Sequence, residues 1–171
     1  MKKTKTEALD LFRSFIMKER KDLPWLKNRL GMLDCAAAVS YITERKPEII
    51  SCGAFVAQLK KEKAWHTLKD GLPKQGQLVF FDWSGHEGNT GNHDHVGIVL
   101  NAAHDHVEYI SADSTKPVPG LVTINKHVGW HWVSGYADVN YAKPAPAATP
   151  AATTSKPVAA AKATKPSEKA I

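Results

Sequence analysis

The sequence predicts an α+β fold in which N-terminal helices pack on an antiparallel β-sheet. In the first part of the chain, apolar residues recur at helical spacing. From residue 77 onward they form short runs of β-branched and aromatic residues separated by turn residues. Because the helical segments come first and the strands follow, the pattern differs from the alternation that gives a wound parallel sheet. A length of 171 residues is enough for one domain.

Three helices are expected in the N-terminal part. The apolar residues of the first are Leu9, Phe12, Phe15 and Ile16. Charged residues lie between them, so this helix is amphipathic. The second helix covers 35–45 and ends before Pro47, because proline cannot continue a helix. The third covers 53–62, where several apolar residues are followed by lysines.

Strands are expected after the turn that Pro73 and Gly76 mark. Their ranges are 77–83, 95–100, 106–112, 120–125 and 130–137. The strands 95–100 and 106–112 should form a hairpin with Asn101 opposite His106. In that register the residue numbers of two paired residues add up to about 207. The residue beside His95 is then 112, give or take one.

The last thirty residues differ in composition from the rest. Residues 142–171 are rich in Ala, Pro, Thr and Lys, and they predict a disordered tail or linker after a domain at 1–141. The tail holds five lysines and one glutamate, so it carries +4 of the formal charge of +6. The domain therefore carries only +2.

Composition also argues against several classes of partner. No basic stripe is interleaved with aromatic residues, so nucleic-acid binding is not expected. No apolar run approaches the roughly 18 residues of a membrane span, so membrane insertion is not expected. The N-terminal lysines are not followed by an apolar segment, and we expect synthesis in the cytoplasm without a signal peptide. Cys35 and Cys52 are expected to be free thiols.

Two residues suggest nucleophilic catalysis. Cys35 opens an apolar helical run, and a thiol at a helix N-terminus gains thiolate character from the helix dipole. His95 begins an apolar strand after a loop rich in Gly and Asn. An imidazole at that position can face the helix N-terminus, hold the thiolate as an ion pair and pass its proton onward.

The order and spacing of several short motifs resemble the CHAP family of cysteine- and histidine-dependent amidohydrolases and peptidases. The segments that carry the resemblance are CAAAVSY at 35–41, KAWH at 63–66, PKQGQLVFFDW at 73–83, DHVGIV at 94–99 and VSGY at 133–136. They cover about residues 30–141. Many members of this family are the catalytic modules of phage endolysins.

The resemblance implies a papain-like fold and cleavage of amide bonds in bacterial peptidoglycan by a monomer. It implies no cofactor and no metal ion. The protein would act on the cell wall after release from the cytoplasm. A phage endolysin, a virion lysin and a bacterial effector all fit the sequence, and so do cleavage of the stem peptide and of a cross-bridge.

The resemblance also assigns roles. Cys35 would attack the carbonyl carbon, and His95 would activate it and protonate the leaving amine. The family commonly has Glu-Gly-Asn where this chain has Ser111, Ala112 and Asp113. Asp113 is therefore the candidate that orients the imidazole, and Ser111 is the neutral alternative.

Three alternatives remain at this level. Cys52 is a rival nucleophile, because Cys-Gly-Ala-Phe-Val at 52–56 superficially repeats a Cys-Ala-x-Phe-Val pattern. It lies only thirteen residues before Trp65, so we interpret it as structural. Asp34 replaces the tryptophan that the family has before the nucleophile, and its charge would raise the thiol pKa unless the carboxylate points away. A non-catalytic wall-binding or structural module on a degenerate papain-like fold is the alternative function.

The remaining histidines give no metal signature. His86, Glu87 and His93 share one loop, but their spacing is not that of zinc ligands, and a solvated loop is the preferred interpretation.

Overall fold

The computed structural model describes residues 2–26, 34–45, 51–84, 93–113 and 121–144. The helices are α1 (Lys5–Arg13), α2 (Asp34–Ile42) and α3 (Cys52–Lys61), with 3₁₀ turns at Arg20–Asp22, Pro24–Leu26 and Leu68–Asp70. The strands are β1 (Trp65–His66), β2 (Leu78–Phe81), β3 (His95–Ala103), β4 (His106–Ala112), β5 (Val122–Val128) and β6 (Val133–Ala137).

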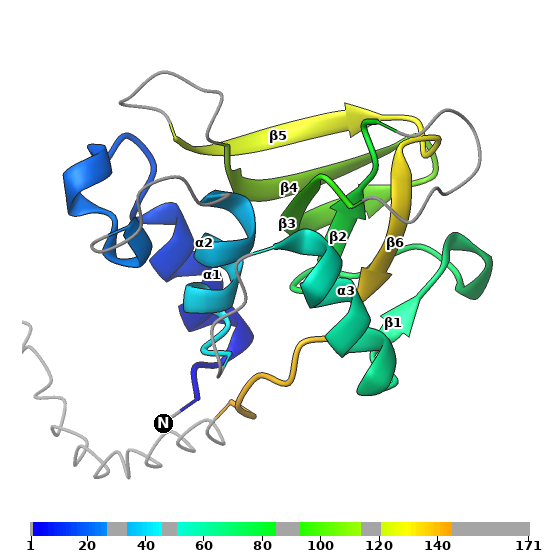
Figure 1. Cartoon of the computed structure of the whole chain (residues 1–171), viewed down its shortest axis with the longest axis horizontal. Helices are drawn as coiled ribbons and strands as arrows, with labels where there is room; N and C mark the ends of the chain where they lie inside the picture. Colours follow the sequence, from blue (N-terminus) through cyan, green and yellow to red (C-terminus); the bar gives the residue numbers. More distant parts are fainter. Residues whose placement is uncertain (1, 27–33, 46–50, 85–92, 114–120, 145–171) are drawn as a thin grey trace, which may run out of the picture.

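The strands form one six-stranded sheet in the order β1-β6-β2-β3-β4-β5. Every neighbouring pair is antiparallel. Figure 1 shows the helices gathered against the sheet, with α1 and α2 side by side and α3 near β2 and β6. The predicted α+β class, with N-terminal helices and an antiparallel sheet, is confirmed.

Both faces of the central strands are buried. Phe80 belongs to the larger core cluster, which includes side chains of α1, α2 and α3. Its neighbour Phe81 belongs to a second cluster with Val99, Tyr109 and Val133, and Trp130 and Trp132 pack against that cluster. Because side chains alternate along a strand, the two phenylalanines anchor β2 from opposite faces.

The hairpin register differs from the expected one. Ala103, not Asn101, lies opposite His106, and a bulge lies between Val99 and Asn101. The turn therefore comprises only His104 and Asp105, and the extra residue is taken up within the strand. A sequence pattern of period two does not reveal such a bulge. The two-residue strand β1 was also not expected, because it is too short to show a pattern.

The two ends of the described domain lie together. Thr4 caps α1 in a capping box with Glu7. Thr4 also forms an isolated parallel bridge with Ala142. The backbone N–H of Ala142 donates to the Lys3 carbonyl at 2.9 Å. The domain thus extends at least to the first residue of the predicted tail. Residues 145–171 of that tail lie outside the described residues.

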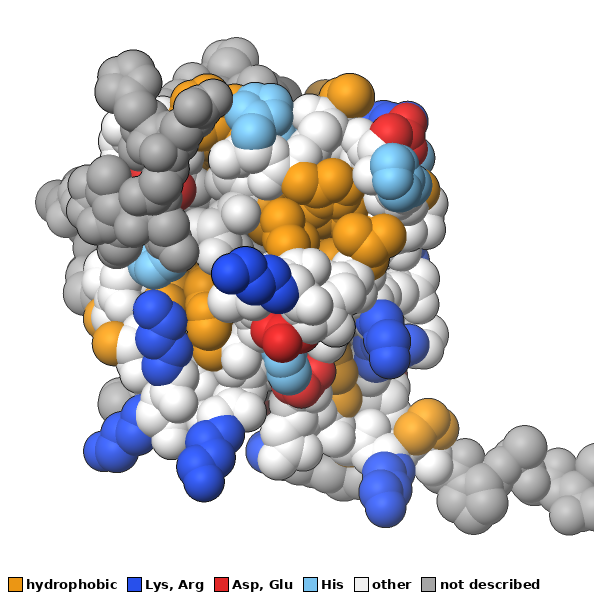
Figure 2. All heavy atoms as spheres, turned by 90° about the vertical axis from the view of Figure 1, so that its right-hand side faces the viewer, with side chains coloured by type: hydrophobic (Ala, Val, Ile, Leu, Met, Phe, Trp, Pro, Cys, Tyr) orange, Lys and Arg blue, Asp and Glu red, His pale blue; other side chains and the backbone are white. Residues whose placement is uncertain are grey.

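Charged side chains are dispersed on the face shown in Figure 2. Lysine and arginine side chains are spread over its lower half, with acidic and hydrophobic groups between them, and they form no continuous basic strip. In the part of the chain that the structure describes, no helix has the length and apolar character needed to cross a bilayer.

Gly97 and Gly53 provide a matched pair of substitutions for testing the packing of β3 against β4. A Cβ atom at Gly97 would overlap the Tyr109 ring and lie 3.0 Å from the Ile110 carbonyl oxygen. We expect Gly97→Ala to lower the free energy of unfolding by about 1–3 kcal/mol, as overpacked positions do. Gly53 is exposed on α3 with nothing within 4 Å of such an atom, and Gly53→Ala should raise stability by up to about 1 kcal/mol. Urea unfolding measures both, and equal effects would contradict this packing.

Candidate active site

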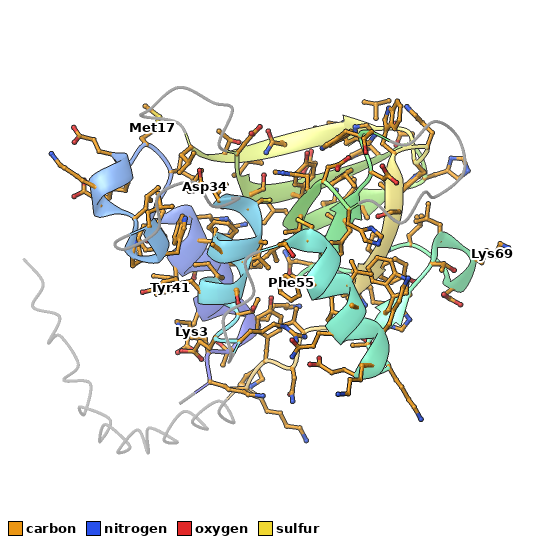
Figure 3. All side chains as sticks on the ribbon, viewed as in Figure 1. Lys3, Met17, Asp34, Tyr41, Phe55 and Lys69 are labelled. Atoms are coloured by element: carbon orange, nitrogen blue, oxygen red, sulfur yellow. The ribbon has the colours of Figure 1, made fainter. Side chains whose placement is uncertain are left out.

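Cys35 lies in the first turn of α2, directly after Asp34. The residues that follow it, Ala36 to Ala38, are strong helix formers and are fully buried, so their small side chains let the helix pack closely on the core. Figure 3 labels Asp34 and Tyr41 near opposite ends of this helix. The side chain of Cys35 is 4% exposed. The N-terminal backbone N–H groups of α2 favour negative charge at its sulfur.

Cys52 is the first residue of α3 and lies beside Cys35. Its Sγ is 3.7 Å from Sγ of Cys35, and both cysteines are buried and free. Ser51 caps α3 by accepting a hydrogen bond from the Ala54 N–H at 3.2 Å. The N-terminal ends of α2 and α3 therefore meet at the two sulfur atoms. The two thiols are free, as expected, but the sequence did not predict their contact.

His95 is the first residue of β3 and is almost fully buried. It pairs with Phe81 of β2, and its ring centroid lies 6.1 Å from that of Phe81 and 6.0 Å from that of Tyr109. Its Nε2 lies 3.0 Å from Oγ of Ser111 on β4. Because Nε2 is engaged with Ser111, Nδ1 is the ring nitrogen available to the sulfur of Cys35.

A chain of polar groups continues behind His95. Nδ2 of Asn125 donates to Oγ of Ser111 at 3.1 Å and to Oγ1 of Thr123 at 3.0 Å. Ser111 is fully buried, and Asn125 is partly buried on β5. The register explains this contact, because Ser111 lies opposite Thr123 and Tyr109 opposite Asn125. Asn125 was missed at the sequence level, where nothing but the β4–β5 register could have indicated it.

Asp113 follows the last residue of β4. Its backbone N–H donates to the Leu121 carbonyl at 2.8 Å. The structure brings Cys35, His95 and Ser111 together, with Ser111 as a hydrogen-bond partner of the His95 ring. The orienting role of Asp113 stays a prediction.

The surroundings of Cys35 favour its thiolate. A hydrogen bond from Cys52 is the largest cause that lowers the pKa of Cys35 to about 5, against the opposing effect of burial. A hydrogen bond with His95, the His95 charge and the Val96 N–H lower it further. The hydrogen bond with Cys35 and burial both raise the pKa of Cys52.

These opposite shifts give the two sulfurs different roles. The lowered pKa of Cys35 and the raised pKa of Cys52 assign the shared proton to Cys52, which makes its S–H the donor and the Cys35 sulfur the acceptor. A negative charge on the neighbouring Asp34 would by itself raise the pKa of Cys35. The net shift of the Cys35 pKa is downward, so any such effect is outweighed.

The expectation that His93 lies in a solvated loop is wrong. It is partly buried, its Nδ1 lies 2.9 Å from Oγ of Ser134, and its ring packs edge-on against Trp65. Burial lowers its pKa, so the neutral ring is favoured. His86 and Glu87 lie outside the described residues. Among the residues that are described, no group of three or more His, Cys, Asp or Glu side chains is placed to hold a metal ion.

Comparison with known proteins identifies no relative of this chain. The chain matches no protein-family model. Neither a curated protein nor a solved structure matches it. The assignment of a function therefore depends on the site itself and on the order of the motifs.

The pH dependence of alkylation tests the hydrogen bond between the two cysteines. In the unaltered chain, Cys35 should react with iodoacetamide far faster than Cys52 at neutral pH, with a rate that is half-maximal near pH 5. Cys52→Ala removes the donor, so the pKa of Cys35 rises and the midpoint moves to higher pH. Hydrogen bonds to charged groups contribute about 1.5–3 kcal/mol, which corresponds to about one to two pH units.

Cys52→Ser is the matched control, because its hydroxyl can still donate to the thiolate. Its midpoint should stay closer to that of the unaltered chain. A midpoint that does not move in Cys52→Ala would show that Cys52 does not stabilise the thiolate.

Proposed function

We propose that this chain is a cysteine-dependent hydrolase that cleaves amide bonds in peptidoglycan, on a papain-like fold. The observation that carries the proposal is the buried Cys35 sulfur at a helix N-terminus, with a pKa lowered to about 5 partly by His95. Purely structural cysteines in apolar surroundings have raised pKa values and are inert. A thiolate kept next to an imidazole is the arrangement that nucleophilic catalysis requires.

The first half-reaction transfers the acyl group to sulfur. Sγ of Cys35 attacks the carbonyl carbon, and the negative charge moves to the carbonyl oxygen. The backbone N–H of Cys35, at the start of α2, is the candidate donor to that oxygen. The C–N bond then breaks as Nδ1 of His95 gives its proton to the leaving amine.

The second half-reaction releases the product. Neutral His95 accepts a proton from water, and the resulting hydroxide attacks the thioester carbonyl carbon. The C–S bond breaks, which regenerates the thiolate and the carboxylic acid product. Ser111 keeps the ring in place through Nε2 during both halves. None of these steps uses a cofactor.

The substrate class comes from the resemblance to the CHAP family and from charge. The motifs of that family span about residues 30–141 in the expected order. A modest positive excess on the whole chain is compatible with an anionic wall polymer. We propose that the protein acts as a monomeric lytic enzyme on the cell wall, after release from the cytoplasm in which it is made.

Digestion of purified peptidoglycan tests this function. The full chain should release muropeptides with new amine and carboxyl ends, which mass spectrometry identifies and which also locate the cleaved bond. Cys35→Ala and His95→Ala should reduce the rate at least about 10³-fold, because loss of a member of such a catalytic unit removes most of its rate enhancement. If Cys35→Ala still cleaves the walls, the nucleophile is misassigned. If the unaltered chain binds walls without cleaving them, the non-catalytic wall-binding alternative is correct.

The orienting residue can be identified from Ser111→Ala and Asp113→Ala, measured side by side on soluble muropeptides. The contact between Ser111 and Nε2 of His95 leads us to expect a roughly 10- to 100-fold loss of kcat in Ser111→Ala, a fraction of what a positioned acid–base group supplies. If Asp113 orients the ring, Asp113→Ala should lower kcat by roughly 10- to 1000-fold, and Asp113→Asn by less, because an amide oxygen can still accept from the ring N–H. The larger of the two alanine losses identifies the orienting residue: a larger loss in Asp113→Ala assigns the role to Asp113, and a larger loss in Ser111→Ala assigns it to Ser111.

A further inference from the structure

We propose that Cys35 and Cys52 form a reversible intramolecular disulfide when a hydroperoxide oxidises the protein, and that this bond switches the candidate nucleophile off. The bond itself rests on the contact between the two sulfurs. The loss of activity rests on the proposed function of Cys35.

The geometry brings the two sulfurs close to bonding distance. Their separation is 3.7 Å, and a disulfide bond is about 2.05 Å long, so about 1.6 Å of approach remains. Cys35 and Cys52 occupy the first turns of two helices. Both residues lie in the same buried cluster.

The unequal acidity of the two thiols sets the order of the steps. The Cys35 thiolate attacks the peroxide, its sulfur is oxidised to a sulfenic acid, and the O–O bond breaks to release hydroxide. The Cys52 sulfur then attacks the Cys35 sulfur. The S–S bond forms, the S–O bond breaks, and the oxygen leaves as water with the proton of Cys52. In total, one hydrogen peroxide oxidises one thiolate and one thiol to the disulfide and yields one water and one hydroxide, which takes up a proton to become a second water.

The second step is favoured by a change of charge. In the reduced site the Cys35 thiolate is itself a cause of the raised pKa of Cys52. Conversion to the neutral sulfenic acid removes that negative charge, so Cys52 loses its proton more readily when its attack is needed. The adjacent thiol also competes with a second peroxide, which would carry Cys35 to an irreversible sulfinic acid.

Mass spectrometry of the full chain after treatment with hydrogen peroxide tests the proposal. We expect an intact mass lower by about 2 Da and, in a non-reducing digest, one cross-linked peptide pair containing both cysteines. Dithiothreitol should restore the mass and the alkylation of Cys35. If the unaltered chain instead gains about 32 Da at Cys35, forms disulfide-linked dimers or does not react, the proposal is wrong.

Cys52→Ser is the matched control because it keeps a donor but cannot form the bond. Its Cys35 should be oxidised to the sulfinic acid, and dithiothreitol should not reverse the change. A dithiothreitol-reversible product in this variant that equals that of the unaltered chain would overturn the assignment of Cys52.

Wall-cleaving activity, measured on the same samples, separates this proposal from the proposed function. We expect activity to fall in proportion to the cross-linked fraction and to return with dithiothreitol. A cross-link in a chain that never cleaves walls would refute the function alone. Activity that persists in the fully cross-linked chain would refute the switch.

Discussion

Burying a thiolate costs free energy because water is removed from the charge, and hydrogen-bond donors must offset that cost. Cys35 is 4% exposed, yet its pKa is lowered to about 5. The donors come from outside its own helix: Cys52 from α3, and His95 and the Val96 N–H from β3. The site exists only while α2, α3 and β3 keep their relative positions. The packing of the rest of the fold fixes the relative positions of these three elements.

Aromatic packing holds α3 against the sheet. Phe55 of α3, labelled in Figure 3, contacts Phe80 of β2 edge to face, with ring centroids 5.8 Å apart. Trp65 contacts Phe80 from β1 at 5.4 Å. Because β2 lies next to β3, this packing ties Cys52 to the strand that carries His95. The small residues of α2 belong to the same core cluster, and they let the helix that carries Cys35 pack closely against it.

Sequence patterns were enough for the class of fold and for its main elements. Helical spacing located all three helices, and runs of apolar residues located the five longer strands. The positions of Cys35 and His95 at the starts of a helix and a strand followed from the same patterns. These features are local, so a single sequence contains them.

The rest of the site depends on contacts between segments far apart in the chain. The two sulfurs meet only because α2 and α3 pack with their N-terminal ends together. The bulge between Val99 and Asn101 shifts the hairpin register, and the contact of Asn125 with Ser111 depends on the pairing of β5 with β4. No pattern within either segment encodes these pairings. The roles of Cys52 and Asn125 therefore became apparent only from the structure.

The chemistry of position 52 links the acidity of the site to its sensitivity to oxidation. A thiol is ordinarily a weak donor, but a charged acceptor strengthens the hydrogen bond it makes. Cys52 can therefore stabilise the Cys35 thiolate while remaining 1% exposed, where a hydroxyl would cost more free energy to bury. The same proximity that stabilises the thiolate places a second sulfur beside it. A single contact thus underlies both proposals, the nucleophilic thiolate of Cys35 and its oxidation to a disulfide.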